Sequence, residues 1–392
     1  MNVLHIIPHK DFFPPNNGGA LRCYHISQEL AKHFNLTILS RQNKNDFRST
    51  PIFSWNNSIN AITPNKKETK TLFSKIGNAI IYRWHQRNIL KPANIVFLEL
   101  YPTLKKLLKE NSFDVIIFEH LSAEELSVVV RKKAPKTKLI IDEHNVDYLL
   151  YQQENAENTK LISDTFKREK SLYKRIDQIW TCSEEDQRVL YKLNKGKVYV
   201  YVVPNGVDST TKKFSTDTTN NKKSIMFCGA LTTQANKDGL LWFYNTIWPL
   251  LNNKDISFNI IGKGGDLSDF SIIKNDPTVN FFGEVESLEP YYRNNHIAIV
   301  PLRIGSGTRL KILEAMSFGN PVISTSKGAE GINYKDKENI LIADTPEEFA
   351  NAIMTLIDDK SLSDKIKINA RHLIEDNYSW EIIGNTIKNI LT

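Results

Sequence analysis

Ten consecutive residues combine two glycines, two cations and a carboxylate in an order that suits a phosphorylated ligand: Gly305-Ser306-Gly307-Thr308-Arg309-Leu310-Lys311-Ile312-Leu313-Glu314. They follow a predicted strand at 297–301 and lead into a predicted helix at 309–318. Glycine lets the main chain approach a ligand closely, and Thr308 is predicted to be the N-cap of the helix. The N–H groups and the positive dipole end of a helix N-terminus bind phosphate. The cations Arg309 and Lys311 oppose that dipole, and a bound diphosphate would explain them.

The carboxylate that closes this run, Glu314, has two interpretations. It follows Lys311 by three positions, so the two side chains could form an ion pair on the helix surface. Alternatively, Glu314 accepts hydrogen bonds from both hydroxyls of a nucleotide ribose. The residue types alone do not choose between the two.

The rest of the chain predicts two sheets that would position this loop. Short apolar runs, among them 115–118, 178–181, 224–228 and 257–261, alternate with helical patterns such as 103–110 and 238–251. This alternation is typical of doubly wound parallel sheets. The polar stretch 209–223 separates the two series. We therefore predict an α/β protein with one Rossmann-like domain at 1–205 and another at 206–375. Such sheets bind ligands beyond the carboxyl ends of their strands, so the expected site is the cleft between the domains.

The composition favours a globular protein of the cytoplasm. The 392 residues are 41% hydrophobic and 24% charged, and no apolar run approaches the roughly 20 residues that cross a bilayer. The N-terminal segment lacks the basic and apolar regions of a signal peptide. Three widely spaced cysteines, Cys23, Cys182 and Cys228, argue against a disulfide framework or a zinc site.

Positive charge is concentrated in the first domain. Residues 1–205 hold 31 Lys/Arg against 21 Asp/Glu, and the excess is densest at 66–91, where Glu68 is the single acidic residue. Apolar residues interleave with these cations. The segment is interpreted either as a contact with the anionic inner face of the cytoplasmic membrane or as a solvated helix. We find no nucleic-acid-binding motif and expect no nucleic-acid partner.

Several motifs stand in the order found in family-4 retaining glycosyltransferases, and the resemblance covers the whole chain. Residues 305–325 and 328–332 closely resemble the donor site of that family, in its subgroup with a glycine-rich motif. Other segments that resemble the family are 17–22, 143–147, 203–208, 227–230, 236–242, 258–265, 279–283 and 378–380. The resemblance implies the GT-B fold: two Rossmann-like domains facing a cleft, with a C-terminal helix at 376–392 that crosses back to the first domain.

The resemblance also implies roles for the matching donor-site residues. Glu314 would bind the nucleotide ribose. Arg309 and Lys311 would neutralise the diphosphate leaving group, beside the main-chain N–H groups of Gly307 and Thr308. Many family members carry a second glutamate eight positions before the ribose-binding one. Ser306 stands at that position here, so Glu330, in the following loop, becomes the candidate contact to the donor sugar.

The first domain would complete the site. The loop at Gly18 and Gly19 would reach the same phosphates, and His144 would lie beside the transferred sugar. The implied reaction moves a sugar, with retention, from a UDP- or GDP-linked donor to a glycan or lipid-linked acceptor, most often for a surface polysaccharide. No metal or other cofactor is implied, because the cations take the role of Mg²⁺.

Three alternatives stay open. The first is another GT-B nucleotide-sugar enzyme, such as an epimerase or a disaccharide-phosphate synthase. The second is an NAD-dependent oxidoreductase, although the first βα turn lacks the Gly-x-Gly-x-x-Gly fingerprint. The third is a non-catalytic nucleotide-sugar-binding module, which the serine at position 306 keeps open.

Overall fold

The structure is a computed structural model, and it describes most of the chain. The described residues are 1–10, 12–15, 17–42, 60–63, 80, 94–209, 214, 223–251, 255–264, 270–305 and 307–392. Two features of the sequence lie outside them. These are Ser306 and, apart from Ile80, the basic segment 66–91, so the expectation of membrane contact concerns residues that are not described.

The chain divides into two compact units. Unit 1 comprises Met1–Tyr148, Thr159–Val203 and Ile383–Thr392, and unit 2 comprises Leu149–Asn158 and Pro204–Ile382. The sequence placed the boundary at 205–206, two residues later than the division at Val203 and Pro204. The C-terminal residues grouped with unit 1 begin at Ile383, whereas the expected crossover helix began at 376.

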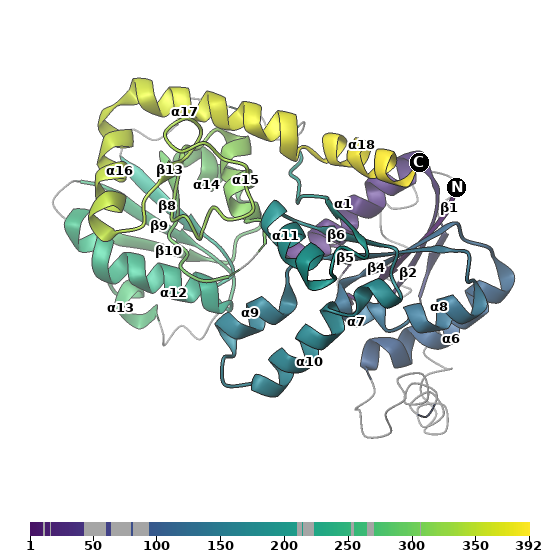
Figure 1. Cartoon of the computed structure of the whole chain (residues 1–392). Helices are drawn as coiled ribbons and strands as arrows, with labels where there is room; N and C mark the ends of the chain where they lie inside the picture. Colours follow the sequence, from purple (N-terminus) through teal and green to yellow (C-terminus); the bar gives the residue numbers. More distant parts are fainter. Residues whose placement is uncertain are drawn as a thin grey trace. The chain divides into compact units, whose positions relative to one another are not determined.

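Unit 1 contains a seven-stranded, fully parallel sheet in the order β3-β2-β1-β4-β5-β6-β7. Figure 1 labels β1, β2, β4, β5 and β6 of this sheet. Its strands are β1 (Asn2–Ile7), β2 (Asn35–Ser40), β3 (Asn60–Ile62), β4 (Val115–Glu119), β5 (Lys138–Glu143), β6 (Gln178–Thr181) and β7 (Tyr199–Val202). The central strands are buried along almost their whole length, as helices on both faces of a parallel sheet require. The strand order reverses between β1 and β4, and the carboxyl ends there are the expected ligand site.

Helices connect these strands. They are α1 (Gly18–His33), α6 (Ile95–Glu110), α7 (His120–Glu124), α8 (Ser127–Lys133), α9 (Asp147–Glu154), α10 (Thr159–Glu169) and α11 (Glu184–Leu193). The helix predicted at 103–110 starts earlier, at Ile95, because Asn94 caps it and Pro102 lies inside it.

Unit 2 contains a six-stranded parallel sheet in the order β10-β9-β8-β11-β12-β13. Its strands are β8 (Ser224–Cys228), β9 (Ser257–Ile261), β10 (Val279–Gly283), β11 (Ile297–Val300), β12 (Val322–Ser324) and β13 (Leu341–Ile342). Its helices are α12 (Gln234–Trp242), α13 (Ser271–Lys274), α14 (Glu289–Asn294), α15 (Leu310–Phe318), α16 (Pro346–Asp358), α17 (Lys360–Leu373) and α18 (Trp380–Leu391), the last of which ends in unit 1. Here the order reverses between β8 and β11.

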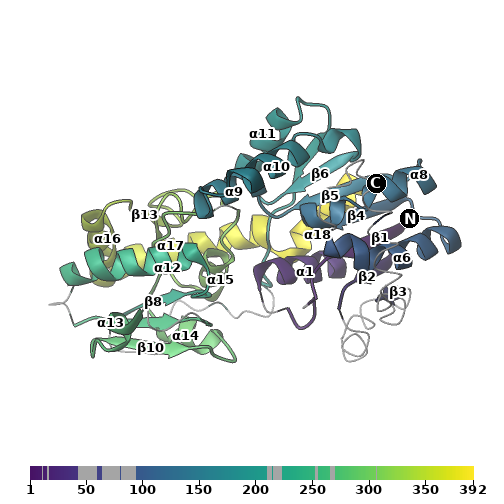
Figure 2. The ribbon, with the colours of Figure 1, turned by 90° about the horizontal axis from the view of Figure 1, so that it is seen from below.

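Alternating side chains of this sheet build two cores. Ile225 and Phe227 of β8 pack into one cluster with α12 and α16, whereas Met226 between them packs into another with α14 and α15. Figures 1 and 2 show these helices along the two faces of the sheet. Successive strand residues point to opposite faces, so a strand covered on both sides is apolar at every position. Each unit is thus a Rossmann-like layer structure.

The described residues include no helix that is both long and apolar enough to cross a membrane.

Candidate functional site

The loop between β11 and α15 bends at two glycines. Gly305 has φ +115° and Gly307 has φ +73°, both in the region that favours glycine. A Cβ atom added to Gly305 would lie 2.6 Å from Nη2 of Arg309, so the guanidinium packs against the main chain of the loop. The N–H of Gly305 donates to Oε1 of Gln153 at 2.8 Å, within the same unit. The loop therefore presents a main-chain donor and a cation together.

The predicted N-cap is wrong by one residue. Arg309, with φ −84° and ψ 95°, takes the N-cap position, and α15 begins at Leu310. The hydroxyl of Thr308 instead donates to the carbonyl oxygen of Gly331 at 3.4 Å. The cap prediction rested on residue type, because threonine commonly caps helices. This hydrogen bond connects the loop to the segment that contains Glu330.

Lys311 points from the first turn of α15 toward the end of β8. Its Nζ donates to Oδ1 of Asn236 at 2.5 Å and lies 4.6 Å from the ring centroid of Phe227. A Cβ atom at Gly229 would lie 2.5 Å from this Nζ, so glycine makes room for the ammonium. Burial and neighbouring Arg309 lower the pKa of Lys311 to about 8, although Cys228 acts in the opposite direction. An ammonium placed at the switch point of the sheet is a binding group for an anion.

Glu314 lies one turn further along α15 and is partly buried. Burial raises the pKa of Cys228 to about 11, Lys311 opposes this rise, and Glu314 adds to it. Glu314 also helps to raise the pKa of the buried Tyr292. The carboxylate and the ammonium are thus both near the end of β8.

The structure gives Glu330 a partner of its own. Its Oε2 lies 2.5 Å from Nζ of Lys327, and both side chains are about one-third exposed. A contact with a donor sugar would have to compete with this ion pair. Glu330 and Glu314 belong to the same unit as the loop, as the sequence predicted for a donor domain.

In unit 1, Gly18 and Gly19 form the first turn of α1. Asn17 is the N-cap, and its Oδ1 accepts from the N–H of Ala20 at 2.9 Å. In a helix the N–H groups of the first turn have no intrahelical acceptor, which leaves those of Gly18 and Gly19 for other partners. A Cβ atom on Gly19 would lie 3.4 Å from Nδ1 of His144 and 3.4 Å from the ring of His9. The structure thus brings the predicted glycines and His144 together.

His144 follows β5 and is held by a carboxylate that the sequence did not single out. Its Nε2 lies 2.7 Å from Oε2 of Glu119, the last residue of β4. The other oxygen of Glu119 makes a short contact with Nε2 of His5, and both of these side chains are fully buried. A charged residue directly after the buried strand 115–118 was the signal that could have revealed Glu119, because parallel strands end together at the ligand site.

A second buried pair supports this cluster. Arg22 of α1 binds Asp142 of β5 through two nitrogens, with Nε–Oδ2 at 2.9 Å and Nη2–Oδ1 at 2.6 Å. Both side chains have no exposed surface. Burial alone would lower the pKa of Arg22, but Asp142 holds it above the usual range. Two parallel hydrogen bonds fix the orientation of both groups.

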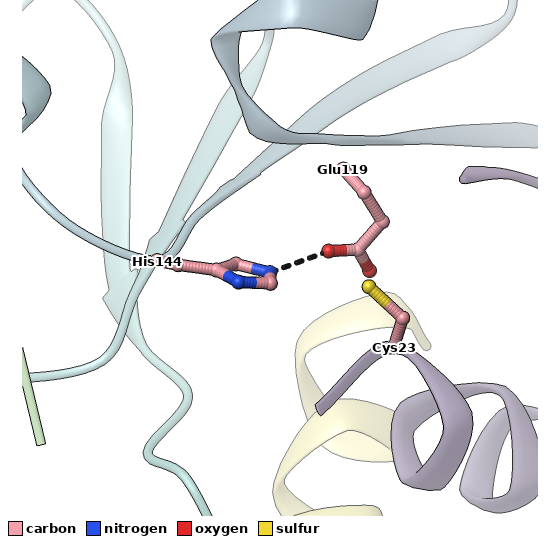
Figure 3. A group of neighbouring side chains, drawn as sticks. All are labelled: Cys23, Glu119 and His144. Carbon is pink, nitrogen blue, oxygen red and sulfur yellow. Dashed lines mark hydrogen bonds and ion pairs between the residues drawn. The ribbon is translucent and has the colours of Figure 1, made fainter. Parts of the chain in front are cut away.

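The cluster also contains a set of potential metal ligands. Cys23, Glu119 and His144 each offer one ligand atom, and these atoms lie within 4.8 Å of one another. Figure 3 shows the His144 ring directed at one oxygen of Glu119, with the Cys23 sulfur beside the carboxylate. All three residues are buried. The expectation of no metal site had considered only cysteine spacing and acidic motifs in the sequence.

Comparison with known proteins identifies the class and then the family. Solved structures with the same arrangement include sucrose-phosphate synthase of Thermosynechococcus elongatus (TM-score 0.74, 15% identity, 99% of this chain and 98% of that chain). HepE of Anabaena in complex with UDP-glucose is another (TM-score 0.66, 13% identity, 100% and 99% of the two chains). The fold is GT-B, with two Rossmann-like α/β domains.

Sequence comparison adds the family. The family described as Glycosyltransferase Family 4 matches residues 16–211, which is half of the chain, and Glycosyl transferases group 1 matches residues 222–359. An uncharacterized 44.6 kDa protein in the cps region of Klebsiella pneumoniae is 31% identical over 173 residues. That match covers 42% of this chain and 45% of the Klebsiella protein, less than half of either. The chain belongs to glycosyltransferase family 4.

Proposed function

We propose that this protein transfers a sugar from a UDP- or GDP-linked donor to a hydroxyl of a glycan or lipid-linked acceptor. The transfer would retain the anomeric configuration and need no metal ion. The observation that carries the proposal is the partly buried ammonium of Lys311, which Asn236 and the Phe227 ring hold at the switch point of unit 2. Neutral partners leave its charge available for a diphosphate. The UDP-glucose complex of HepE supports a uridine donor.

Each residue of the unit 2 loop has a proposed role. Glu314 would accept hydrogen bonds from the ribose hydroxyls. Arg309 and Lys311 would bind the diphosphate, together with the N–H groups of Gly305, Gly307 and Thr308, and Ser306 would lie beside them. A phosphate oxygen would replace Oε1 of Gln153 on the N–H of Gly305. The N–H groups of Gly18 and Gly19 would bind another oxygen of the donor.

The reaction that fits these groups breaks the bond between the anomeric carbon and the β-phosphate oxygen. The acceptor oxygen forms its bond to that carbon on the same face, through an oxocarbenium-like state. The proton of the acceptor hydroxyl moves to the released phosphate oxygen. Cations and N–H groups fixed before the reaction stabilise the charge that develops there, which is the main source of acceleration in such sites.

The remaining groups would act on the sugar. His144 would contact the transferred sugar, and Glu330 would do so after separating from Lys327. The relative in the cps region of Klebsiella pneumoniae supports a role in polysaccharide biosynthesis. We propose that the product is a surface polysaccharide and that the enzyme acts in the cytoplasm, at the inner face of the membrane that holds lipid-linked acceptors.

A thermal-shift screen with UDP, GDP, ADP and CMP tests the donor site. We expect one nucleoside diphosphate to raise the melting temperature of the wild type and to lose this effect in Glu314→Ala. Glu330→Ala is the matched control, since it removes a carboxylate of the same unit outside the ribose site. If no nucleotide stabilises the wild type, or if Glu314→Ala responds as the wild type does, the assignment is wrong.

Product analysis tests the reaction. Nucleotide release that depends on an added glycan or lipid-linked acceptor is expected, and it would separate a transferase from an epimerase or a binding module. The anomeric proton coupling of the product should match that of the donor, and EDTA should leave the rate unchanged. An inverted product or a rate restored only by Mg²⁺ would contradict the proposed mechanism.

A further inference from the structure

Four buried side chains of unit 1 form one continuous hydrogen-bonded chain. It runs from Ser27 of α1 through His5 of β1 and Glu119 of β4 to His144 after β5. The side chains of His5 and Glu119 have no exposed surface, and that of His144 is 7% exposed. These buried groups cannot replace their hydrogen bonds with bonds to water, so each link of the chain must contain one proton.

Ser27 determines which atom holds the proton of its link to His5. The hydroxyl of Ser27 donates to the carbonyl oxygen of Cys23 at 2.8 Å. A hydroxyl has a single proton, so toward His5 its oxygen can only accept. Nδ1 of His5, at 2.9 Å from Oγ of Ser27, is therefore protonated.

The next two links share Glu119. One proton lies between His5 and Glu119, and another between Glu119 and His144. If the carboxylate holds neither proton, His5 is an imidazolium and Nε2 of His144 is protonated. If the carboxylate holds the proton of the link to His5, then His5 is neutral and Nε2 of His144 is again protonated.

The remaining arrangement places the proton of the link to His144 on Glu119. It would leave the imidazolium of His5, which has no exposed surface, beside a neutral acid. An uncompensated buried charge is strongly unfavourable. The nearby charges of Arg22 and Asp142 already compensate each other through their paired contacts. In both acceptable arrangements, Nε2 of His144 is therefore protonated.

We infer that Glu119, whose other oxygen faces His5, is a positioning residue that holds His144 with Nε2 protonated and, in the neutral ring, with Nδ1 as an unprotonated acceptor facing the first turn of α1. Burial alone would raise the pKa of Glu119, but the two histidines hold it well below its usual value, which favours the carboxylate form. Burial also lowers the pKa of His120, whose ring centroid lies 3.7 Å from that of His144. Nε2 of His120 is 3.0 Å from that of His9.

The distance between Oε2 of Glu119 and Nε2 of His144 is that of a hydrogen bond. Two ligands of one tetrahedral zinc ion, each about 2.0–2.1 Å from it, lie roughly 3.3 Å apart. Nε2 of His144 and Oε2 of Glu119 are 2.7 Å apart. The group formed with Cys23 is thus arranged for a hydrogen bond at this link.

The chemistry beside Nδ1 selects a hydroxyl group. Nδ1 needs a donor, whereas the N–H groups of Gly18 and Gly19 need an acceptor. A hydroxyl supplies both, and a fully ionised phosphate oxygen supplies only the acceptor. Gly19 leaves room here, because its added Cβ would lie 3.4 Å from Nδ1. That the hydroxyl belongs to the sugar rests on the proposed function, whereas the protonation of His144 does not.

Nitrogen NMR of the full chain with ¹⁵N-labelled histidine, at pH 8 without ligand, tests the inference. His144→Gln identifies the signals of His144. We expect Nε2 to give the shift of a protonated nitrogen and Nδ1 that of an unprotonated one. The opposite pattern in the wild type overturns the inference, and no variant beyond the assignment is needed for this test.

Three variants separate positioning from packing. Glu119→Ala should release His144 into a mixture of its two neutral tautomers, because it removes the acceptor for the proton on Nε2. Glu119→Gln is the conservative control and should keep the wild-type pattern, because Nε2 of neutral His5 takes the amide N–H and the amide oxygen then accepts from Nε2 of His144. Ser27→Ala should leave His144 unchanged, since Glu119 stays in place. An unchanged His144 pattern in folded Glu119→Ala would remove the positioning role. Adding UDP and then UDP-glucose tests the hydroxyl: we expect Nδ1 to move only with the sugar, and equal shifts with both ligands would contradict it. A failed nucleotide screen with the expected NMR pattern would reject the proposed function alone.

Discussion

Arg22 of unit 1 and Lys311 of unit 2 are held in opposite ways. In unit 1, Arg22 faces Asp142 through two hydrogen bonds, so each charge has a partner of opposite sign. In unit 2, Lys311 contacts the amide of Asn236 and the ring of Phe227, which are neutral. Paired charges stabilise and orient groups, whereas a charge with neutral neighbours keeps its attraction for a ligand. The comparison predicts that substitutions in unit 1 affect folding and those in unit 2 affect binding.

Asp142→Asn should give the largest effect. It would leave the guanidinium of Arg22 buried without its carboxylate, and breaking such a pair costs about 3–5 kcal/mol. Urea unfolding measures the loss. Glu184→Gln, which breaks an ion pair to Arg188 whose side chains are 68% and 66% exposed, is the control and should cost about 1 kcal/mol or less. Equal losses in the two variants would mean that burial does not strengthen the pair of Arg22 and Asp142.

Lys311→Met should weaken nucleotide binding and change folding much less. A hydrogen bond to a charged group contributes about 1.5–3 kcal/mol, so the affinity should fall about 10- to 150-fold. Calorimetric titration with the nucleotide found in the screen measures this. Lys335→Met, at a side chain that is 73% exposed, is the matched control. A stability loss as large as that of Asp142→Asn would mean that the ammonium is structural.

The affinity for that nucleotide should also fall above pH 8. The lowered pKa of Lys311 means that its ammonium is charged below about pH 8 and loses its proton as the pH rises through that value. The charged fraction then falls about tenfold per pH unit, and affinity falls by at most that factor. Titrations from pH 7 to pH 9.5 measure the trend. Lys311→Met should show no such fall, and a flat profile in the wild type would assign the binding to other groups.

The smallest effect concerns the loop glycines. Gly305→Ala and Gly283→Ala both place a side chain at positive φ, +115° and +70°, and each should lose about 1–2 kcal/mol of stability. Only Gly305→Ala pushes on Arg309, since nothing lies within 4 Å of a Cβ at Gly283. Nucleotide affinity should therefore fall in Gly305→Ala alone. Thermal unfolding and titration of both variants decide this, and a matching fall in Gly283→Ala would point to a general loosening of the unit.

Much of the fold could be predicted because most central strands are buried on both faces. Strands such as 178–181, 224–228 and 257–261 have the predicted bounds, since a buried parallel strand is a continuous apolar run between polar residues. β3 was not predicted, because Asn60–Ile62 is too short to form a run. The helix predicted at 238–251 is an α-helix at Gln234–Trp242, followed by a π turn and a 3₁₀ turn. Such changes of hydrogen-bond pattern have no distinct apolar period.

The candidate site was predictable where its residues are consecutive. The loop at 305–314 forms one segment of sequence, so its glycines and cations could be recognised together. Glu119, His5 and Asn236 could not be matched to their partners, because each lies in another strand or helix and meets its partner only through the sheet order. The N-cap at Arg309 was also missed, since Thr308 bonds to Gly331, a residue distant in sequence.

The end of the chain limits how this protein can be dissected. Ile383–Thr392 belongs to unit 1, and Ile383 and Ile387 there are each 1% exposed. A Cβ atom on Gly384 would lie 2.3 Å from Oε2 of Glu29 in α1, so this helix packs closely against α1. A fragment that stops at Val203 would expose this apolar surface and is expected to aggregate. An engineered unit 1 therefore needs the last ten residues joined back to it by a linker, and a shortened C-terminus would damage the half of the protein that begins the chain.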